Sequence, residues 1–171
     1  GKIASEVREM VRKKDWIGKT VYEICEEVEG EIKKRGAKCA FPVNTSINEI
    51  AAHYTAEPND PITIKDTDLV KIDLGAQVNG YIADTAVTVC YDAQYDGLVQ
   101  TAEEALANAM AMIKTGVKAS DIGRTIESTI KQKGFKPIAN LSGHSLDQYT
   151  IHAGRSIPNI WSIGGFSLSE D

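Results

Sequence analysis

Apolar residues near the start of the chain follow the spacing of one face of an α-helix, with charged residues between them. The pattern predicts one amphipathic helix over residues 4–14 and a second that begins near Val21 and ends before Gly36. The apolar stripe of the second helix consists of Val21, Ile24, Cys25, Val28 and Ile32. Glycine readily adopts the left-handed conformation that ends a helix, which puts the stop at Gly36.

The same spacing returns later and predicts two more helices, one over residues 96–114 and one that begins at Ser120 or Asp121 and stops at Gly134. The apolar face predicted for the earlier of these consists of Leu98, Val99, Ala102, Leu106, Ala109 and Ile113. A shift of 98 residues aligns Ile24 with Ile122, Val28 with Ile126, Ile32 with Ile130 and Gly36 with Gly134. Any two amphipathic helices that end in glycine align in this way, but the order helix, helix, loop in both halves favours an internal repeat.

Two β-rich runs, residues 69–78 and 81–89, lie between the helix pairs and are separated only by Asn79-Gly80. Both turn residues tolerate positive φ, so they predict a β-hairpin with a two-residue turn. The expected fold class is therefore mixed, α/β or α+β, with a pseudo-twofold repeat of helix, helix, loop and hairpin. The 98-residue shift places the start of a second hairpin at the last residue, Asp171, so the second half is expected to be incomplete.

Two aspartates converge in the predicted hairpin. Its register places Gly75 opposite Asp84, and Asp73 is two residues from Gly75, so the two carboxylates point to one face as diagonal neighbours. Each interrupts an apolar strand, where an ionised carboxylate needs a cationic side chain or a metal ion nearby. The pair favours divalent metal ions. The alternative is that one aspartate turns outward on a half-exposed sheet.

Three histidines, His53, His144 and His152, are the other candidate ligands. Each taken alone is more often a hydrogen-bonded structural residue than a ligand. Together with two carboxylates, neutral imidazoles suit Mn, Fe, Co or Zn better than Mg or Ca. Gly143 before His144 would let the backbone come close to a ligand.

Composition limits the remaining choices. The chain has 171 residues, 42% of them hydrophobic, and a net charge of −5, which fits one globular domain and argues against binding to nucleic acid or an anionic membrane. We expect a soluble, intracellular protein, because no apolar run could cross a bilayer and the N-terminus has no hydrophobic signal segment. Cys25, Cys39 and Cys90 form no CxxC pair and are expected to be buried free thiols. Walker, GxSxG and HExxH motifs are absent.

Several motifs resemble those of one enzyme family. They are Phe41-Pro42-Val43-Asn44, Ala51-Ala52-His53-Tyr54-Thr55, Lys71-Ile72-Asp73-Leu74-Gly75 with Asp84, Asn140-Leu141-Ser142-Gly143-His144-Ser145-Leu146-Asp147-Gln148-Tyr149 and Ile151-His152-Ala153-Gly154. The chain resembles the type 2 methionine aminopeptidases, the archaeal and eukaryotic class, which have the pita-bread α/β fold. The motifs around His144 and His152 differ from those of the type 1 enzymes and the prolidases, which share this fold.

The resemblance implies a site for two divalent metal ions, Co, Mn, Fe or Zn. Asp73 would be bidentate on one metal, Asp84 would bridge the two, and His144 would bind the second. A bridging water or hydroxide would be the nucleophile, because divalent ions lower the pKa of bound water toward neutrality.

The resemblance also implies a substrate site. His53 would contact the substrate amide or the developing tetrahedral centre, and His152 would assist near the scissile carbonyl. Phe41 and Ile151 would form walls of the pocket for the methionine side chain. The implied reaction removes the initiator methionine from nascent chains whose second residue is small, in the cytoplasm near ribosomes, with no nucleic-acid or membrane partner.

Two glutamate ligands of that family's site have no counterpart here. They would follow Ile151-His152-Ala153-Gly154, where the only acids are Glu170 and Asp171. We therefore expect residues 1–171 to be the N-terminal part of a single pita-bread catalytic domain that stops before the second metal-binding hairpin. Alone, this part would bind metal weakly and hydrolyse peptides poorly or not at all.

Two alternatives remain open. One is a non-catalytic pita-bread protein that has become a binding module, although the presence of Asp73, Asp84 and His144 argues against it. The other is a hydrolase like aminopeptidase P or prolidase, with the same metal chemistry but specificity for proline. The motif around His144 disfavours this second alternative.

Overall fold

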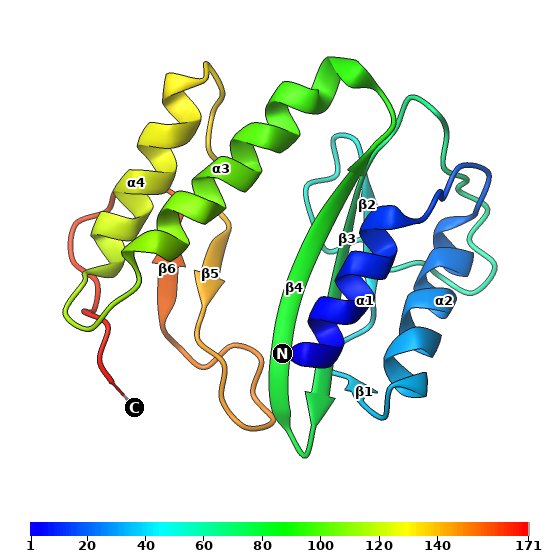
Figure 1. Ribbon diagram of the computed structural model, residues 1–171, viewed down its shortest axis with the longest axis horizontal. Coiled ribbons are helices and arrows are strands. Elements are labelled where there is room, and N and C mark those ends of the chain that lie inside the picture. Colours follow the sequence, from blue (N-terminus) through cyan, green and yellow to red (C-terminus); the bar gives the residue numbers. More distant parts are fainter. Residues whose placement is uncertain (171) are drawn as a thin grey trace. The chain divides into compact units, whose positions relative to one another are not determined.

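The computed structural model describes residues 1–170 (Figure 1). They form two compact units. The first contains residues 1–95 and the segment Asp147–Ile151, and the second contains residues 96–146 and the chain from His152 onward. Within residues 1–170, no helix is both long and apolar enough to cross a membrane.

The first unit consists of two helices and a four-stranded antiparallel sheet. Its elements are α1 (Lys2–Lys13), α2 (Val21–Lys34), β1 (Lys38–Cys39), β2 (Asn44–Ile47), β3 (Leu69–Val78), β4 (Tyr81–Cys90) and the short 3₁₀ turn η1 (Ala93–Tyr95). β4 pairs with β3 along its whole length, so β1 and β2 share the other edge of β3 one after the other. Both predicted helices and the predicted hairpin are confirmed, with Gly36 and Gly80 at positive φ.

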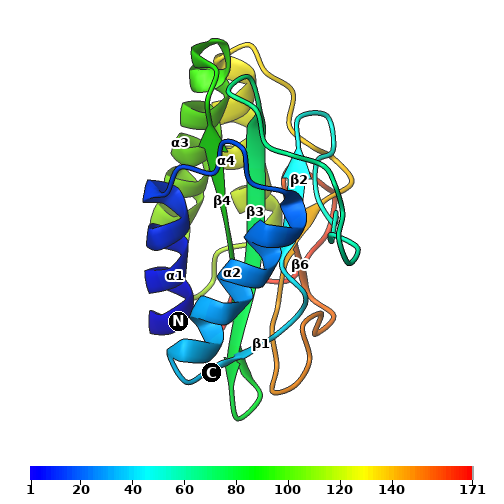
Figure 2. The same ribbon diagram turned by 90° about the vertical axis from the view of Figure 1, so that its right-hand side faces the viewer.

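The core of the first unit lies between α1, α2 and one face of the sheet. Every second residue of β3, from Val70 to Ala76, points into this core and is buried. The predicted stripe of α2 is buried opposite them. Figure 2 shows α2 in front of the β3–β4 ribbon with α1 beside it. The other face of β3 therefore remains available for polar side chains.

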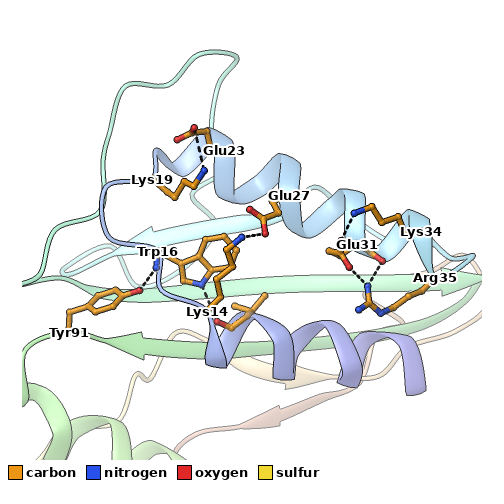
Figure 3. A network of polar contacts seen from close by, with 10 residues as sticks. Lys14, Trp16, Lys19, Glu23, Glu27, Glu31, Lys34, Arg35 and Tyr91 are labelled. Atoms are coloured by element: carbon orange, nitrogen blue, oxygen red, sulfur yellow. Dashed lines mark hydrogen bonds and ion pairs between the residues drawn. The ribbon is translucent and has the colours of Figure 1, made fainter.

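Polar contacts hold the connection between α1 and α2 in place (Figure 3). Lys14 forms an ion pair with Glu27 of α2. The indole Nε1 of the buried Trp16 donates to the carbonyl oxygen of Val11 at 3.0 Å, and its backbone N–H donates to the Tyr91 hydroxyl at 2.7 Å. These bonds satisfy polar groups that burial would otherwise leave without a partner.

The second unit repeats part of this plan. Its elements are α3 (Asp96–Met112), α4 (Ala119–Gln132), β5 (Ser142–His144) and β6 (Ser156–Pro158). α4 has the same length as α2 and begins 98 residues after it, and β5 begins 98 residues after β2. The internal repeat is therefore present in the structure as far as β5, which pairs with the short strand β6.

Three sequence-based expectations need correction. Leu98, Leu106 and Ile113 of the apolar face predicted over residues 96–114 are exposed, and Ile113 lies just after the end of α3; of that face the helix buries Ala109, and it also buries Thr101 and Ala105. α4 begins at Ala119, and its N-cap is Lys118, whose side chain makes no capping bond. All three cysteines are free as expected, but only Cys25 is buried, whereas Cys39 and Cys90 are partly exposed.

Candidate metal and substrate site

The two predicted carboxylates lie on one face of the β3–β4 hairpin. Gly75 is paired with Asp84 and Asp73 with Ala86, so Asp73 and Asp84 are diagonal neighbours in the predicted register. Their face is opposite the one that packs against α1 and α2. The Oδ1 atom of Asp73 is shielded from solvent. A shielded carboxylate oxygen beside a second carboxylate is a donor set that suits a divalent cation.

Lys71 shares this face, two residues before Asp73. Its Nζ donates to the backbone carbonyl of Asn48 at 2.6 Å, and burial lowers the pKa of its ammonium group. Asn48 has a positive φ of 51°, and its side chain is tied to Asp68 at 2.9 Å. Lys71 thus helps to fix the turn that follows β2.

His53 is exposed and has a positive φ of 67°, which is uncommon for residues other than glycine. The residues that follow it are held by β2. The Tyr54 carbonyl accepts from Thr45 N at 2.8 Å, and the Asn44 Nδ2 donates to the Thr55 hydroxyl at 2.9 Å. Asn44 is also paired directly with Asp73. A side chain in such a backbone conformation keeps its place only when its surroundings hold it, as happens at functional sites.

The segment Asp147–Ile151 docks on the turn of the hairpin. Tyr149 N donates to the Gly80 carbonyl and Gln148 Nε2 donates to the Asn79 carbonyl, both at 2.9 Å. This contact brings Ile151, one predicted wall of the methionine pocket, into the first unit. Phe41, the other predicted wall, lies against β3 at Gly75.

The remaining histidines lie together in the second unit. The rings of His144 and His152 meet edge to face with their centroids 4.4 Å apart. Two backbone hydrogen bonds hold the segments that carry them together: Ser145 N donates to the Arg155 carbonyl and Ala153 N donates to the Ser145 carbonyl, each at 2.9 Å. His144 therefore keeps a fixed imidazole neighbour.

The structure thus groups the predicted site residues within each unit. Asp73, Asp84, Phe41, His53 and Ile151 belong to the first unit, and His144 and His152 belong to the second. Among residues 1–170, no three His, Cys, Asp or Glu side chains are grouped closely enough to hold a metal ion. The three-ligand set remains a prediction.

The comparisons with known proteins decide the family. The model of metallopeptidase family M24 matches residues 1–170. The chain belongs to this family. The M24 chain is 44% identical to the methionine aminopeptidase of Methanothermus fervidus, over 94% of the chain and 92% of that relative.

Other similar proteins carry the same name. The M24 chain is 50% identical to the methionine aminopeptidase of Pyrococcus abyssi over 94% of its own length, and it spans 55% of that relative, about half. The crystal structure of a methionine aminopeptidase from Thermotoga maritima matches 99% of the M24 chain and 72% of its own, with 29% identity and a TM-score of 0.89. The fold is the pita-bread fold of these metallopeptidases.

Sequence reasoning missed the residues that support the site. Asn44 and Thr55 were noticed only as parts of motifs, because their bond joins residues 11 positions apart in a loop that has no periodic pattern. Gly75 offered a usable signal, since a glycine inside a strand often marks a close approach of another group.

Proposed function

We propose that the M24 chain is the N-terminal part of a type 2 methionine aminopeptidase, which removes the initiator methionine from nascent chains whose second residue is small. The observation that carries the proposal is the Asp73–Asp84 pair on the polar face of the β3–β4 hairpin, with the ring of Phe41 packed against β3 at Gly75. Relatives named methionine aminopeptidase, one of them 50% identical, support it.

The proposed ligands of two divalent ions, Co, Mn, Fe or Zn, are Asp73 and Asp84 from the first unit and His144 from the second. Carboxylate and imidazole donors fit these metals, and the shielded Oδ1 of Asp73 fits a ligand atom. Bound there, such ions would lower the pKa of a water molecule and polarise the scissile carbonyl.

The other residues would bind and orient the substrate. Phe41 and Ile151 would enclose the methionine side chain and exclude water from it. His53 would donate a hydrogen bond to the substrate amide, from a position fixed by the bonds of β2 to Tyr54 and Thr55. His152 would stabilise charge that develops near the carbonyl.

The second unit supports a further part of the proposal, namely that the catalytic domain includes a second hairpin outside residues 1–171. An apolar groove of about 300 Å³ lies between α3 and α4 and is lined in part by Ala102, Ala105, Ile126 and Ile130. A shift of 98 residues maps these positions onto Ala4, Val7, Val28 and Ile32, which pack in the core of the first unit. A hairpin like β3–β4 would cover the groove and could carry the two glutamate ligands.

The substrates of such an enzyme leave the ribosome, so we place its work in the cytoplasm near ribosomes. The net charge of −5 argues against binding to nucleic acid or an anionic membrane, and neither is proposed as a partner.

The test is hydrolysis by the intact enzyme loaded with Mn²⁺ or Co²⁺. We expect release of methionine from Met-Ala-Ser and none of the first residue from Ala-Pro peptides. Asp84→Asn should lower kcat/KM by more than about 100-fold, since even groups that only support metal ligands affect activity by 10–100-fold. Asp66→Asn, in an exposed loop, is the matched control and should leave kcat/KM unchanged.

Cleavage of Ala-Pro in preference to Met-Ala-Ser would replace the proposal with a prolidase-like activity. If the enzyme cleaves neither peptide, whether it is loaded with Mn²⁺ or with Co²⁺, the result would favour the non-catalytic binding module.

A further inference from the structure

Gly75 occupies the middle of β3, where its backbone conformation gives no reason for a glycine. It is not among the residues with positive φ, and its carbonyl accepts a regular bond from Ala40 N at 2.9 Å. Glycine in the middle of a strand lowers stability because the unfolded chain loses more freedom on folding. The absence of a side chain at this position therefore needs another explanation.

The space beside Gly75 is filled by Phe41. A Cβ atom at position 75 would lie 2.7 Å from Cδ1 of the Phe41 ring, closer still to Cε1, and 3.0 Å from Cβ of Ala40. Real Cβ atoms almost never come within 3.0 Å of another heavy atom, so a side chain at this position would displace the ring.

The position of this contact on the sheet relates it to the carboxylates. Gly75 is paired directly with Asp84 and stands two residues from Asp73. Because side chains alternate along a strand, the side of Gly75 covered by Phe41 is the face that carries both aspartates. The ring is thus an apolar wall at the edge of the carboxylate pair.

We propose that Gly75 is a specificity-determining position: its missing side chain seats Phe41 against β3 beside Asp84, and this sets the room left for an unbranched methionine side chain. The inference rests on the proposed function and names how that site selects its substrate. A side chain at position 75 would push Phe41 outward into the space that the substrate needs.

The first test is a double-mutant cycle in the intact enzyme loaded with Mn²⁺. Gly75→Ala should raise KM for Met-Ala-Ser about tenfold with a much smaller change in kcat, as expected when one methyl group disturbs an apolar pocket. Phe41→Ala should also raise KM. Gly75→Ala added to Phe41→Ala should cost nothing more, because the displaced ring is gone.

The matched control is Gly97→Ala in α3. Gly97 also has a phenylalanine ring beside it, but its Cβ would lie 3.9 Å from Cζ of Phe135, an ordinary contact. The KM of the Gly97→Ala variant for Met-Ala-Ser should be unchanged. An effect of Gly75→Ala on kcat alone, or effects that multiply in the double variant, would overturn the inference while leaving the aminopeptidase activity in place.

A second measurement depends neither on enzymatic activity nor on whether the Gly75→Ala variant folds. In NMR spectra, replacement of Phe41 by Leu should move the Gly75 α-proton resonances, because the ring current of the aromatic ring is lost, and should leave those of Gly97 in place. Unmoved Gly75 resonances would overturn the inference. A wild-type enzyme that releases no methionine would instead remove the proposed function, and with it the role of Gly75 in specificity.

Discussion

The helix pairs α1–α2 and α3–α4 are related by the internal repeat, but they differ in how far their apolar faces are buried. In the first unit Val28 and Ile32 of α2 have no exposed surface, because the β3–β4 hairpin covers them. In the second unit Ile126 and Ile130 stand at the equivalent positions of α4 and line an open groove. On α3, Leu106 and Met110 are 60% and 61% exposed.

The difference shows what an amphipathic pattern encodes. The pattern specifies which face of a helix is apolar, but burial depends on the element that covers this face. In the first unit the two ten-residue strands β3 and β4 cover the helix pair, whereas the described part of the second unit contains only the three-residue strands β5 and β6.

The largest expected effect comes from matched core deletions in the two helix pairs. Ile32→Ala should lower the free energy of unfolding by about 3 kcal/mol, because it leaves a cavity in a closed core. Ile130→Ala, its equivalent, should cost about 1 kcal/mol, since the groove is already open. Urea unfolding of the chain followed by circular dichroism measures both losses. Equal losses would show that the two helix pairs are packed alike.

The second prediction compares the chain of residues 1–171 with the intact enzyme. Leu106→Gln should change the stability of the 171-residue chain by less than about 0.5 kcal/mol, as for other exposed positions. In the intact enzyme the same change should cost about 1–3 kcal/mol, because a covering hairpin would bury this side chain. Ile17→Gln, also exposed, should have a small effect in both. If Leu106→Gln changes the stability of the two proteins equally, the result would contradict the proposed second hairpin.

The third prediction concerns the helix starts, which also differ between the halves. α2 begins with a capping box, in which Thr20 Oγ1 accepts from Glu23 N at 3.1 Å and Glu23 Oε2 accepts from Thr20 N at 2.8 Å. α4 has Lys118 and Asp121 at these places and no side-chain cap. Thr20→Ala should therefore cost about 1 kcal/mol, and Lys118→Thr should gain about 0.5–1 kcal/mol. Thermal unfolding checks both signs, and a loss on Lys118→Thr would contradict the comparison.

The smallest effect is on the dependence of stability on pH. Hydrogen bonds from Lys34 and Arg35 lower the pKa of Glu31 from 4.5 to about 2 (Figure 3). A lowered carboxyl pKa stabilises the fold above its ordinary value and loses that effect as pH falls toward the lowered one. Glu31→Gln should therefore flatten the fall of Tm between pH 4.5 and about 2. Glu127 of α4, whose pKa is lowered by Lys131 and then by Trp161 N, should show a smaller flattening on Glu127→Gln. An unchanged slope for Glu31→Gln would refute the role of this network.

Much of the first unit could be predicted from the sequence because its rules are local. Asn79-Gly80 determines the turn, the turn determines the register, and the register places Asp73 and Asp84 on one face. The exposure of Leu98, Leu106 and Ile113 could not be predicted, because periodicity indicates an apolar face but not the element that covers it.

The support of the site could not be predicted for a related reason. The bond between Asn44 and Thr55, the positive φ of His53 and the contact of Phe41 with Gly75 depend on where loops meet the sheet. No period or motif in residues 40–56 specifies those meetings. Pattern and register therefore predicted the carboxylates, whereas the arrangement of the residues around them required the structure.

A crystal structure of the intact enzyme grown with Zn²⁺ would show whether Asp73, Asp84 and His144 hold a metal ion. We expect anomalous-scattering peaks with oxygen atoms of Asp73 and Asp84 at about 2.0–2.2 Å and Nε2 or Nδ1 of His144 as a further ligand. Carboxylates of Asp73 and Asp84 that point apart or bind an arginine or lysine, with zinc bound elsewhere, would contradict this expectation.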